Sequence, residues 1–474
     1  MILSKIDEKS FLLSSLTLNG KFQGISELEP WLHAREVKNN FSVNEVPFRD
    51  MDQWDFDTVS GNIVHVSKKF YSIEGIKVKT NFGNTPEWEQ AIINQPEIGI
   101  LGIITKKFEG VAYFLMQAKM EPGNINISQF SPTVQATKSN YTQIHKGRRP
   151  LFLEYFLEKG KARVIVDQLQ SEQGGAFLRK RNRNMIVEVL ECIELPEDFC
   201  WLTLGQIKQL AAVNDLINMD ARSVLSCIQY MDDDLRSKIV NDIYDFRFEN
   251  NISAYGKKLL ISMAHNNYAE HSMLDVLAWL TEQKVKYQCE VTSVGLNELV
   301  GWSRTEYEIK GSDNCFHINA VKVKAGNREV NSWDQPLVKN LKIGSVGFIT
   351  QKRNNILHFV VQAKVEPGFI DMVELSPTVS ASSACVEDEN IPYMNYFQDE
   401  VKDNMNLSVI LSEEGGRFYK LRNRYMIMEL IESEEVELFD NYIWMTLGQI
   451  LELIKHSGYV SVEMRSLISV MKLL

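Results

Sequence analysis

A lysine and a glutamate stand two positions apart at the end of a predicted strand, and this arrangement occurs twice in the chain. The first copy is QAKMEPG, which begins at Gln117, and the second is QAKVEPG, which begins at Gln362. In a strand, side chains two positions apart share a face, so Lys119 and Glu121 point the same way. A buried lysine needs a paired charge or a ligand. Lys119 is therefore a candidate active-site residue, and a structural ion pair is the alternative.

A glycine pair follows further along each copy. Residues 171–175 read SEQGG and residues 412–416 read SEEGG, and each is followed by an Arg-Asn-Arg triplet. Adjacent glycines let the backbone approach a ligand or cradle an anion. Arginines nearby can hold phosphate oxygens in a bidentate fork. A tight hairpin is the commoner explanation of such a pair.

A loop rich in hydroxyl and amide groups lies between these motifs. In the first copy, residues 131–142 read SPTVQATKSNYT, and such groups suit sugar and base recognition. The second copy reads SPTVSASSACVEDEN from residue 376, where the Ser-Asn-Tyr core is lost and acids appear. If the loop binds an anion, the first copy is the better preserved site. An ordinary surface loop is the alternative.

Two tryptophans stand near the entries of the copies, and one histidine stands on an early strand. Trp54 and Trp302 could each stack on a base, although a core position is more common for tryptophan. His65 has no histidine at the matched position of the second copy, which is Lys310. A lone histidine on a strand is more often structural than catalytic.

These motifs belong to two copies of one domain, about 245 residues apart. Other matching segments are GGAFLRKRNRNMIVEV with GGRFYKLRNRYMIMEL, and WLTLGQI with WMTLGQI. So long a period predicts that each copy has its own core. We expect a helical lead-in over 1–40, a first repeat over 41–217, a helical connector without a counterpart over 218–286, and a second repeat over 287–474.

Apolar periodicity predicts an α+β fold with a mixed sheet in each repeat. Residues 98–107 and 111–119 read as a central hairpin, and residues 151–159 have helical spacing after a proline. Thr203 is the expected N-cap of the helix in LTLGQI. Further strands are expected in the first repeat at 61–66, 70–80, 162–170 and 184–191.

Composition narrows the class of protein. The net charge of −11 argues against non-specific binding of nucleic acid. We see no signal peptide and no apolar run that spans a membrane, and expect a cytoplasmic protein. The cysteines form no CxxC pair and the histidines no HExxH, so no metal site is predicted.

Taken together, these segments resemble the NDP-hexose 2,3-dehydratase family of deoxysugar biosynthesis. The resemblance rests on GNIVHVSKKFYSIEG, QAKMEPG, SPTVQATKSNYT, LEYF, GGAFLRKRNRNMIVEV and WLTLGQI, with their second copies. It implies a Nudix-like fold in each repeat, a homodimer, and dTDP-sugar pockets in both halves, one of them active. The acid-rich Nudix hydrolase motif is absent, which argues against magnesium-dependent pyrophosphate cleavage.

The resemblance implies the substrate dTDP-4-dehydro-6-deoxy-glucose. Its 4-ketone acidifies the proton on C3, a base removes that proton, and the C2 hydroxyl leaves with help from an acid. The product is a 3,4-diketo-2,6-dideoxy sugar. No redox change occurs, so no cofactor is expected. The diketone implies a downstream NADPH-dependent 3-ketoreductase as a partner.

We expect the first repeat to carry the chemistry. Catalytic candidates are His65 or Glu172 as base, Tyr141 as acid or as donor to the C4 oxygen, and Lys119 for the enolate. Trp54 is expected to bind the base, the loop the sugar and diphosphate, and the arginines the phosphate charge. Four further residues complete the expected binding set. The whole set is Trp54, Thr137, Lys138, Ser139, Asn140, Tyr141, Ser171, Gly174, Gly175, Arg181, Arg183 and Trp302.

Two other classes of function stay open at this stage. A non-catalytic nucleotide-sugar binding protein would keep both pockets but leave the 4-keto sugar intact. A Nudix-type hydrolase would release dTMP in the presence of magnesium, and the missing carboxylate helix disfavours it.

Overall fold

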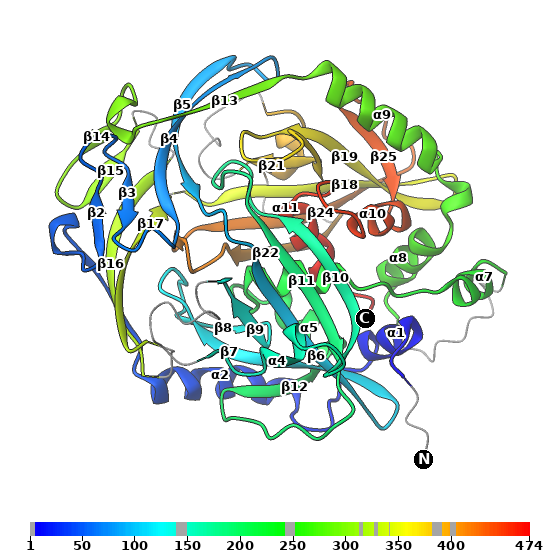
Figure 1. The fold of residues 1–474 in the computed structure, drawn as a ribbon. Coiled ribbons are helices and arrows are strands. Elements are labelled where there is room, and N and C mark those ends of the chain that lie inside the picture. The colour runs from blue at the N-terminus through cyan, green and yellow to red at the C-terminus, as the bar shows by residue number, and fades with distance from the viewer. Residues whose placement is uncertain are drawn as a thin grey trace.

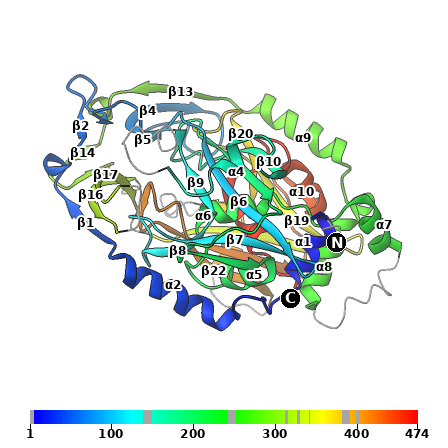
Figure 2. The ribbon, with the colours of Figure 1, turned by 60° about the horizontal axis from the view of Figure 1, so that its bottom comes forward.

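The computed structural model describes the chain except for residues 1–4, 139–148, 242–251, 312–315, 327–329, 341, 382–390 and 399–403. Figure 1 shows two small sheets on one side of the molecule and the helices α7–α9 on the other. The same separation is seen in Figure 2, where α2 also runs along one edge. The α+β class predicted from the sequence is confirmed.

Each repeat contributes one large, seven-stranded sheet. The first comprises β6 (Gly99–Phe108), β7 (Val111–Met120), β8 (Ser128–Ser131), β9 (Val134–Ala136), β10 (Arg163–Ser171), β11 (Arg181–Glu188) and β12 (Phe199–Thr203). The second comprises β18 (Gly344–Arg353), β19 (Ile356–Val365), β20 (Val373–Pro377), β21 (Val379–Ala381), β22 (Met405–Ser412), β24 (Arg422–Leu430) and β25 (Tyr442–Thr446). Both sheets are mixed, because β6 pairs in parallel with β11 and antiparallel with β7, as β18 does with β24 and β19.

The two smaller sheets join strands of both repeats. One comprises β2 (Trp54–Phe56), β3 (Ile63–His65), β4 (Ser72–Thr80), β5 (Glu87–Asn94) and β13 (Cys289–Val294); the other comprises β1 (Ser42–Val46), β14 (Ser303–Arg304), β15 (Glu308–Lys310), β16 (His317–Lys324), β17 (Ser332–Lys339) and β23 (Phe418–Tyr419). The first strand of each repeat pairs with the other repeat: β1 lies on β16 and β13 lies on β4. The repeats are therefore interlocked by exchanged strands.

Helices cover the large sheets and close the chain. The lead-in forms α1 (Glu8–Ser15) and α2 (Ile25–Asn39), as expected, and Thr203 caps α5 (Leu204–Ala211), as predicted. Thr446 caps the equivalent α10 (Leu447–Ile454). The helix expected over 151–159 shortens to α4 (Glu154–Leu157). The connector forms α6 (Met219–Ser226), α7 (Asp233–Asn241), α8 (Ala254–Ala264) and α9 (Met273–Lys286).

The first connector helix does have a counterpart, contrary to the expectation from the sequence. Helix α6 reads MDARSVLS, and α11 (Val462–Val470) near the C-terminus reads VEMRSLISV. The two helices pack against each other, and each holds one completely buried arginine, Arg222 and Arg465. The match is short: an acid, the arginine and two serines correspond, and the other matched positions are apolar.

The largest hydrophobic core is shared between the repeats. It contains Phe114 and Ile186 of the first large sheet together with Phe348 and Ile427 of the second. Each repeat also has a local core of its own, around Trp201 in the first and around Trp444 in the second. The prediction of separate cores is therefore correct only for these local clusters, because the largest core contains residues of both repeats.

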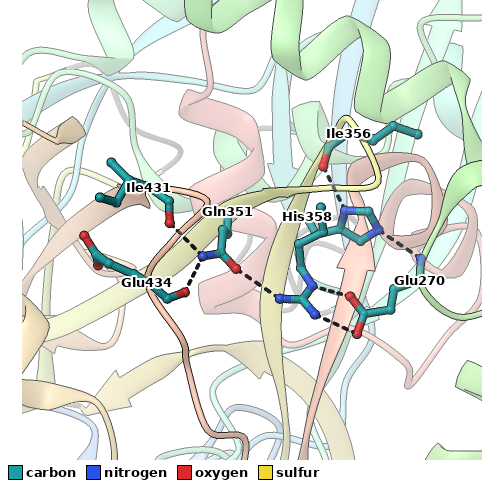
Figure 3. Close-up of polar contacts among 7 residues, drawn as sticks. Glu270, Gln351, Ile356, His358, Ile431 and Glu434 are labelled. Carbon is teal, nitrogen blue, oxygen red and sulfur yellow. Dashed lines mark hydrogen bonds and ion pairs between the residues drawn. The ribbon is translucent and has the colours of Figure 1, made fainter.

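A polar network fastens the connector to the β18–β19 hairpin (Figure 3). Arg353 forms a two-point ion pair with Glu270, and its Nη1 donates to Gln351 Oε1 over 3.1 Å. Gln351 Nε2 donates to the carbonyls of Ile431, at 2.9 Å, and Glu434, at 2.7 Å. The Glu270 N–H donates to His358 Nε2 over 3.0 Å, while His358 Nδ1 lies 2.9 Å from the Ile356 carbonyl. His358 is therefore a neutral ring with its proton on Nδ1.

We expect the stability of the protein to fall when His358 becomes protonated. Burial lowers the pKa of His358 below its ordinary value of 6.5, so the folded state binds this proton less readily than the unfolded state. The contribution is present above pH 6.5 and is lost as the pH falls toward the lower folded pKa. Thermal unfolding between pH 8 and pH 5 should show a steeper loss for the natural chain than for His358→Asn. Equal pH slopes would contradict this role.

Candidate functional site

A turn of each repeat docks on the strand-end turn of the other repeat. We call residues 173–175 and 414–416 the exchange turns. The Gly123 N–H donates to the Gly415 carbonyl over 2.7 Å, and the Lys420 N–H donates back to the Gly123 carbonyl over 2.7 Å. In the other direction, Gly368 N–H donates to the Gly174 carbonyl over 2.7 Å. The repeated motifs EPG and GG thus contact each other across the repeats.

Glycine is required in these contacts. A Cβ on Gly123 would stand 1.6 Å from the Phe418 carbonyl oxygen, and one on Gly415 would stand 2.1 Å from Asn124 Oδ1 and 2.9 Å from Glu121 Cβ. Close approach of backbone to backbone, and not an anion cradle, explains the glycines of the exchange turns.

The exchange turn 414–416 lies against a cluster of acids and cations in the first repeat. We call this the repeat 1 cluster; its members are Lys119 and Glu121 from the end of β7, Gln135 from β9, Glu172 after β10, Lys180 before β11, Asp220 on α6, and Glu414 and Arg417 from the second repeat. Gln135 Nε2 donates to Asp220 Oδ2 and lies 3.4 Å from Glu121 Oε1. Asn182 Nδ2 donates to Glu172 Oε1 over 2.7 Å.

Burial and mutual repulsion hold these carboxyls near neutrality. Burial, followed by the charge of Asp220, raises the pKa of Glu172 to about 7. Burial and Glu121 raise the pKa of Asp220 to about 6, and burial raises that of Glu414 to about 8. Burial also lowers the pKa of Lys180 to about 8. Groups with such values exchange protons readily near pH 7, which is what acid–base catalysis requires.

The second repeat has an equivalent cluster with fewer charges. We call it the repeat 2 cluster: Lys364, Glu366, Ser380, Glu413 and Glu463, with Gln173 from the first repeat. The exchange turn 173–175 supplies Gln173 to the repeat 2 cluster, whereas the exchange turn 414–416 supplies Glu414 to the repeat 1 cluster. Ala176 and Leu421 stand at the positions that correspond to Arg417 and Lys180. The two cations and one acid of the repeat 1 cluster are thus absent from its twin.

The matched glutamates of the two clusters differ in their hydrogen bonds. Glu413 is fully engaged: Oε1 accepts from Asn423 at 2.6 Å and Tyr425 at 2.9 Å, and Oε2 accepts from Gln173 at 2.6 Å. Glu172 accepts from Asn182 through Oε1, but its buried Oε2 has no hydrogen-bond partner. A buried acceptor without a donor is costly. Glu172 Oε2 is thus available to a ligand in a way that Glu413 is not.

The buried arginines Arg222 and Arg465 each donate a hydrogen bond to the backbone next to one cluster. Arg222 Nη2 donates to the Ser412 carbonyl over 2.7 Å, and Arg465 Nη2 donates to the Ser171 carbonyl. Each arginine thus binds the residue that precedes the cluster glutamate of the opposite repeat. Ser171 Oγ also donates to Glu374 Oε2 over 2.6 Å. This network fixes both glutamates across the repeat boundary.

Lys119 and Glu172, both predicted as catalytic residues, each lie near Asp220 in the repeat 1 cluster. Ser171 is buried but faces the second repeat. Gly174 and Gly175 pack on Glu366, since a Cβ on Gly174 would lie 2.8 Å from Glu366 Oε2. These glycines therefore lie at the repeat 2 cluster and not at the repeat 1 cluster, for which they were predicted as binding residues.

Other predicted residues lie elsewhere. Trp54 is only 5% exposed, donates its indole N–H to the Asp334 carbonyl over 2.7 Å, and packs on His65 and Tyr71. His65 Nδ1 lies 2.8 Å from Ser67 Oγ. Trp302 joins the same core, half-buried. Tyr71 lies 4.1 Å from the Arg417 guanidinium, so this aromatic core adjoins the repeat 1 cluster. The predicted roles of His65 and Trp54 stay predictions.

The structure describes the basic triplet 181–183 and only the first part of the polar loop 131–142. Arg183 forms a two-point ion pair with Asp167, at 2.6 Å for both contacts, on a partly exposed part of the sheet. Arg181 is half-buried. Thr137 and Lys138 follow the end of β9, whose middle residue is Gln135 of the cluster. Ser139, Asn140 and Tyr141 lie outside the described residues.

Sequence reasoning missed Lys180, Asp220, Glu414 and Arg417. Asp220 was assigned to a connector without a counterpart, and a comparison of α6 with α11 would have paired it with Glu463. Glu414 and Arg417 were overlooked because each repeat was assumed to build its own site. The signal available was the difference between SEQGGA and SEEGGR.

Two further properties of the described ranges bear on the site. No group of three or more His, Cys, Asp and Glu side chains within these ranges is arranged to hold a metal ion. None of the helices described there is long and apolar enough to cross a bilayer.

The two interlocked repeats enclose buried acids and cations whose pKa values are shifted toward neutrality. The family model of NDP-hexose 2,3-dehydratase matches residues 25–228 and 273–471. A dTDP-4-dehydro-6-deoxy-alpha-D-glucopyranose 2,3-dehydratase from Saccharopolyspora spinosa is 40% identical over 466 residues, covering 97% of this chain and 94% of that protein. Proteins of the same name from Amycolatopsis orientalis and Streptomyces violaceoruber are 40% and 36% identical, covering 96% and 94% of this chain and 92% and 96% of their own lengths.

The chain therefore belongs to the NDP-hexose 2,3-dehydratase family. This membership assigns it to the hydro-lyases, enzymes that remove water across a carbon–carbon bond.

Proposed function

We propose that this enzyme removes water from dTDP-4-dehydro-6-deoxy-glucose at the repeat 1 cluster and yields a dTDP-3,4-didehydro-2,6-dideoxy sugar. The names of the relatives support the substrate. The observation that carries the location is the buried Glu172 Oε2, which lacks a hydrogen-bond partner and belongs to a carboxyl whose pKa is raised by burial to about 7.

Glu172 acts as the general base in this proposal. The 4-ketone makes the C3 proton acidic, and Glu172 takes that proton while the electron pair moves toward the C4 oxygen. A base with a pKa near the working pH serves this step best, because much of it is ionised and it still holds a proton firmly. Glu172 meets that condition because burial and Asp220 both oppose its ionisation.

Cations of the cluster stabilise the charge that develops. Lys119, 7% exposed, would hold the enolate oxygen. Lys180, Arg181 and Arg417 would balance the diphosphate. Tyr141 is proposed to donate to the C4 oxygen, and Thr137, Lys138, Ser139 and Asn140 are proposed to bind the sugar and diphosphate.

The repeat 2 cluster is proposed to have lost the chemistry. Glu413 already accepts three hydrogen bonds, and Lys364 Nζ is bound to Glu366 Oε1 at 2.5 Å and to the Ser380 carbonyl at 2.8 Å. A group engaged in this way must give up its partners before it binds a ligand. We propose that this half binds nucleotide weakly or only structurally.

The remaining expectations enter as part of the proposal. Each repeat is proposed to follow a Nudix-like plan, and the chain is proposed to form a homodimer. A diketo sugar is chemically labile, so a 3-ketoreductase that uses NADPH should consume it.

The test is incubation of the purified protein with dTDP-4-dehydro-6-deoxy-glucose, followed by mass spectrometry. A dehydratase converts the substrate to a species lighter by one water, and adding a 3-ketoreductase with NADPH traps it as a stable product. Recovery of intact substrate, with binding retained, would instead show a non-catalytic nucleotide-sugar binding protein. Release of dTMP in magnesium would show a hydrolase.

A further inference from the structure

Elimination needs an acid as well as a base, because hydroxide is a poor leaving group. The proposed base, Glu172, belongs to the first repeat. Two members of the repeat 1 cluster come from the second repeat, Glu414 and Arg417. Arg417 is assigned to the diphosphate, and Glu414 has no role so far. This inference rests on the proposed function and concerns the residue that gives a proton to the departing C2 hydroxyl.

The exchange turn holds Glu414 firmly at the cluster. Its neighbour Gly415 is bound to the Gly123 N–H and packs on Glu121 Cβ, as the glycine geometry above shows. Arg417, three residues on, lies over the Tyr71 ring and donates to Gln95 Oε1 over 3.1 Å. Gln335 Nε2 fixes the Gly416 carbonyl at 2.7 Å. The turn therefore has contacts on both sides of Glu414.

The surroundings of Glu414 favour the protonated form of its carboxyl group. Asp220, Glu121 and Glu172 of the first repeat all lie close enough to oppose its ionisation, and Arg417 favours it. Like charges in a shared buried site do not all ionise together, so the cluster holds at least one proton near neutral pH.

The access of Glu414 also suits a donor to substrate. Glu121 and Asp220 are each only 5% exposed and share the Gln135 amide, whereas Glu414 is partly exposed. In the matched turn, the corresponding residue is Gln173, which cannot give up a proton and is engaged with Glu413. Glu414 is an acid, whereas Gln173 at the matched position is an amide. Only the repeat 1 cluster therefore receives an acidic side chain from the exchange turn.

We propose that Glu414 is the general acid of the repeat 1 site, so that the second repeat completes the catalytic site of the first. Glu172 takes the C3 proton, and the C3–H electron pair moves to the C4 oxygen and gives the enolate. That electron pair then returns to restore the C4 ketone and forms the C2=C3 double bond. The C2–O bond breaks, and the departing oxygen takes the proton of Glu414 and leaves as water. Glu172 ends protonated and Glu414 ionised. Return of a proton to Glu414 and loss of one from Glu172 through solvent restore the starting state.

The experiment separates the two proton transfers. Exchange of the C3 proton with deuterium from D₂O reports the base alone. A 2-deoxy-2-fluoro analogue of the substrate loses fluoride, which needs no proton from the enzyme. We expect Glu414→Gln to lower elimination from the natural substrate by about 100-fold or more, to keep C3 exchange within about threefold, and to process the fluoro analogue within about threefold of the natural enzyme.

The matched turn supplies the control. Gln173→Ala alters the other exchange turn and should leave elimination from the natural substrate within about threefold. Glu414→Asp, which keeps an acid, should recover part of the lost rate. Full elimination by Glu414→Gln, or equal loss of both substrates and of C3 exchange, would overturn the assignment. Failure of the unaltered enzyme to eliminate water would instead overturn the proposed function.

Discussion

Glu172→Gln is expected to abolish both elimination and exchange of the C3 proton. The amide keeps the shape of the side chain and can still bond to Asn182, but it cannot accept the C3 proton. The loss of a general base typically lowers the rate about 100- to 10,000-fold. The measurement is kcat for product formation together with deuterium incorporation at C3. The substrate should still bind, because Glu172 carries none of the positive charge that holds the diphosphate.

Glu413→Gln is the matched change in the second repeat. It weakens the hydrogen bonds of a buried side chain, so its unfolding midpoint should fall, but kcat should stay within about threefold. A reversal of the two results, with Glu172→Gln active and Glu413→Gln inactive, would move the chemistry to the second repeat.

Arg222→Met is expected to give the largest loss of stability. The guanidinium is completely buried and donates to the carbonyls of Ile217, at 3.1 Å, and Ser412, at 2.7 Å. Methionine fills much of the volume but leaves both carbonyls without these donors. A buried polar group that loses its partner costs about 1–3 kcal/mol. We therefore expect the free energy of unfolding to fall by about 3 kcal/mol or more, measured by urea denaturation.

The comparison for this variant is Arg49→Met. Arg49 is exposed and forms a surface ion pair with Glu306 at 2.7 Å, an interaction worth about 0–1 kcal/mol. Similar losses in the two variants would show that the buried network contributes nothing special. Because Arg222 holds the backbone before Glu413 and Arg465 the backbone before Glu172, Arg465→Met should also lower kcat, whereas Arg222→Met should act mainly on stability.

The duplication and most strands could be read from the sequence because they follow local rules. Dense apolar runs predicted the β6–β7 hairpin, and Thr203 marked the start of a helix by a side-chain cap that forms as expected. Lys119 and Glu121 were singled out by strand alternation alone, and both lie in the buried cluster.

What could not be read depends on contacts between the repeats. The pairing of β1 with β16 and of β13 with β4 follows from the packing of two whole domains, which no local pattern encodes. For the same reason the site was assigned to one repeat, whereas Glu414 and Arg417 reach it from the other. The pair Gly174 and Gly175 predicts a ligand contact from sequence, but glycine is equally required where two backbones meet.

The most direct test is a crystal structure of the Glu172→Gln variant with dTDP-4-dehydro-6-deoxy-glucose bound. The account predicts the hexose in the repeat 1 cluster, with C3 facing the side chain of residue 172 and the C2 hydroxyl within hydrogen-bond distance of Glu414. A hexose seated beside Lys364 and Glu413, with the repeat 1 cluster free of sugar, would contradict it.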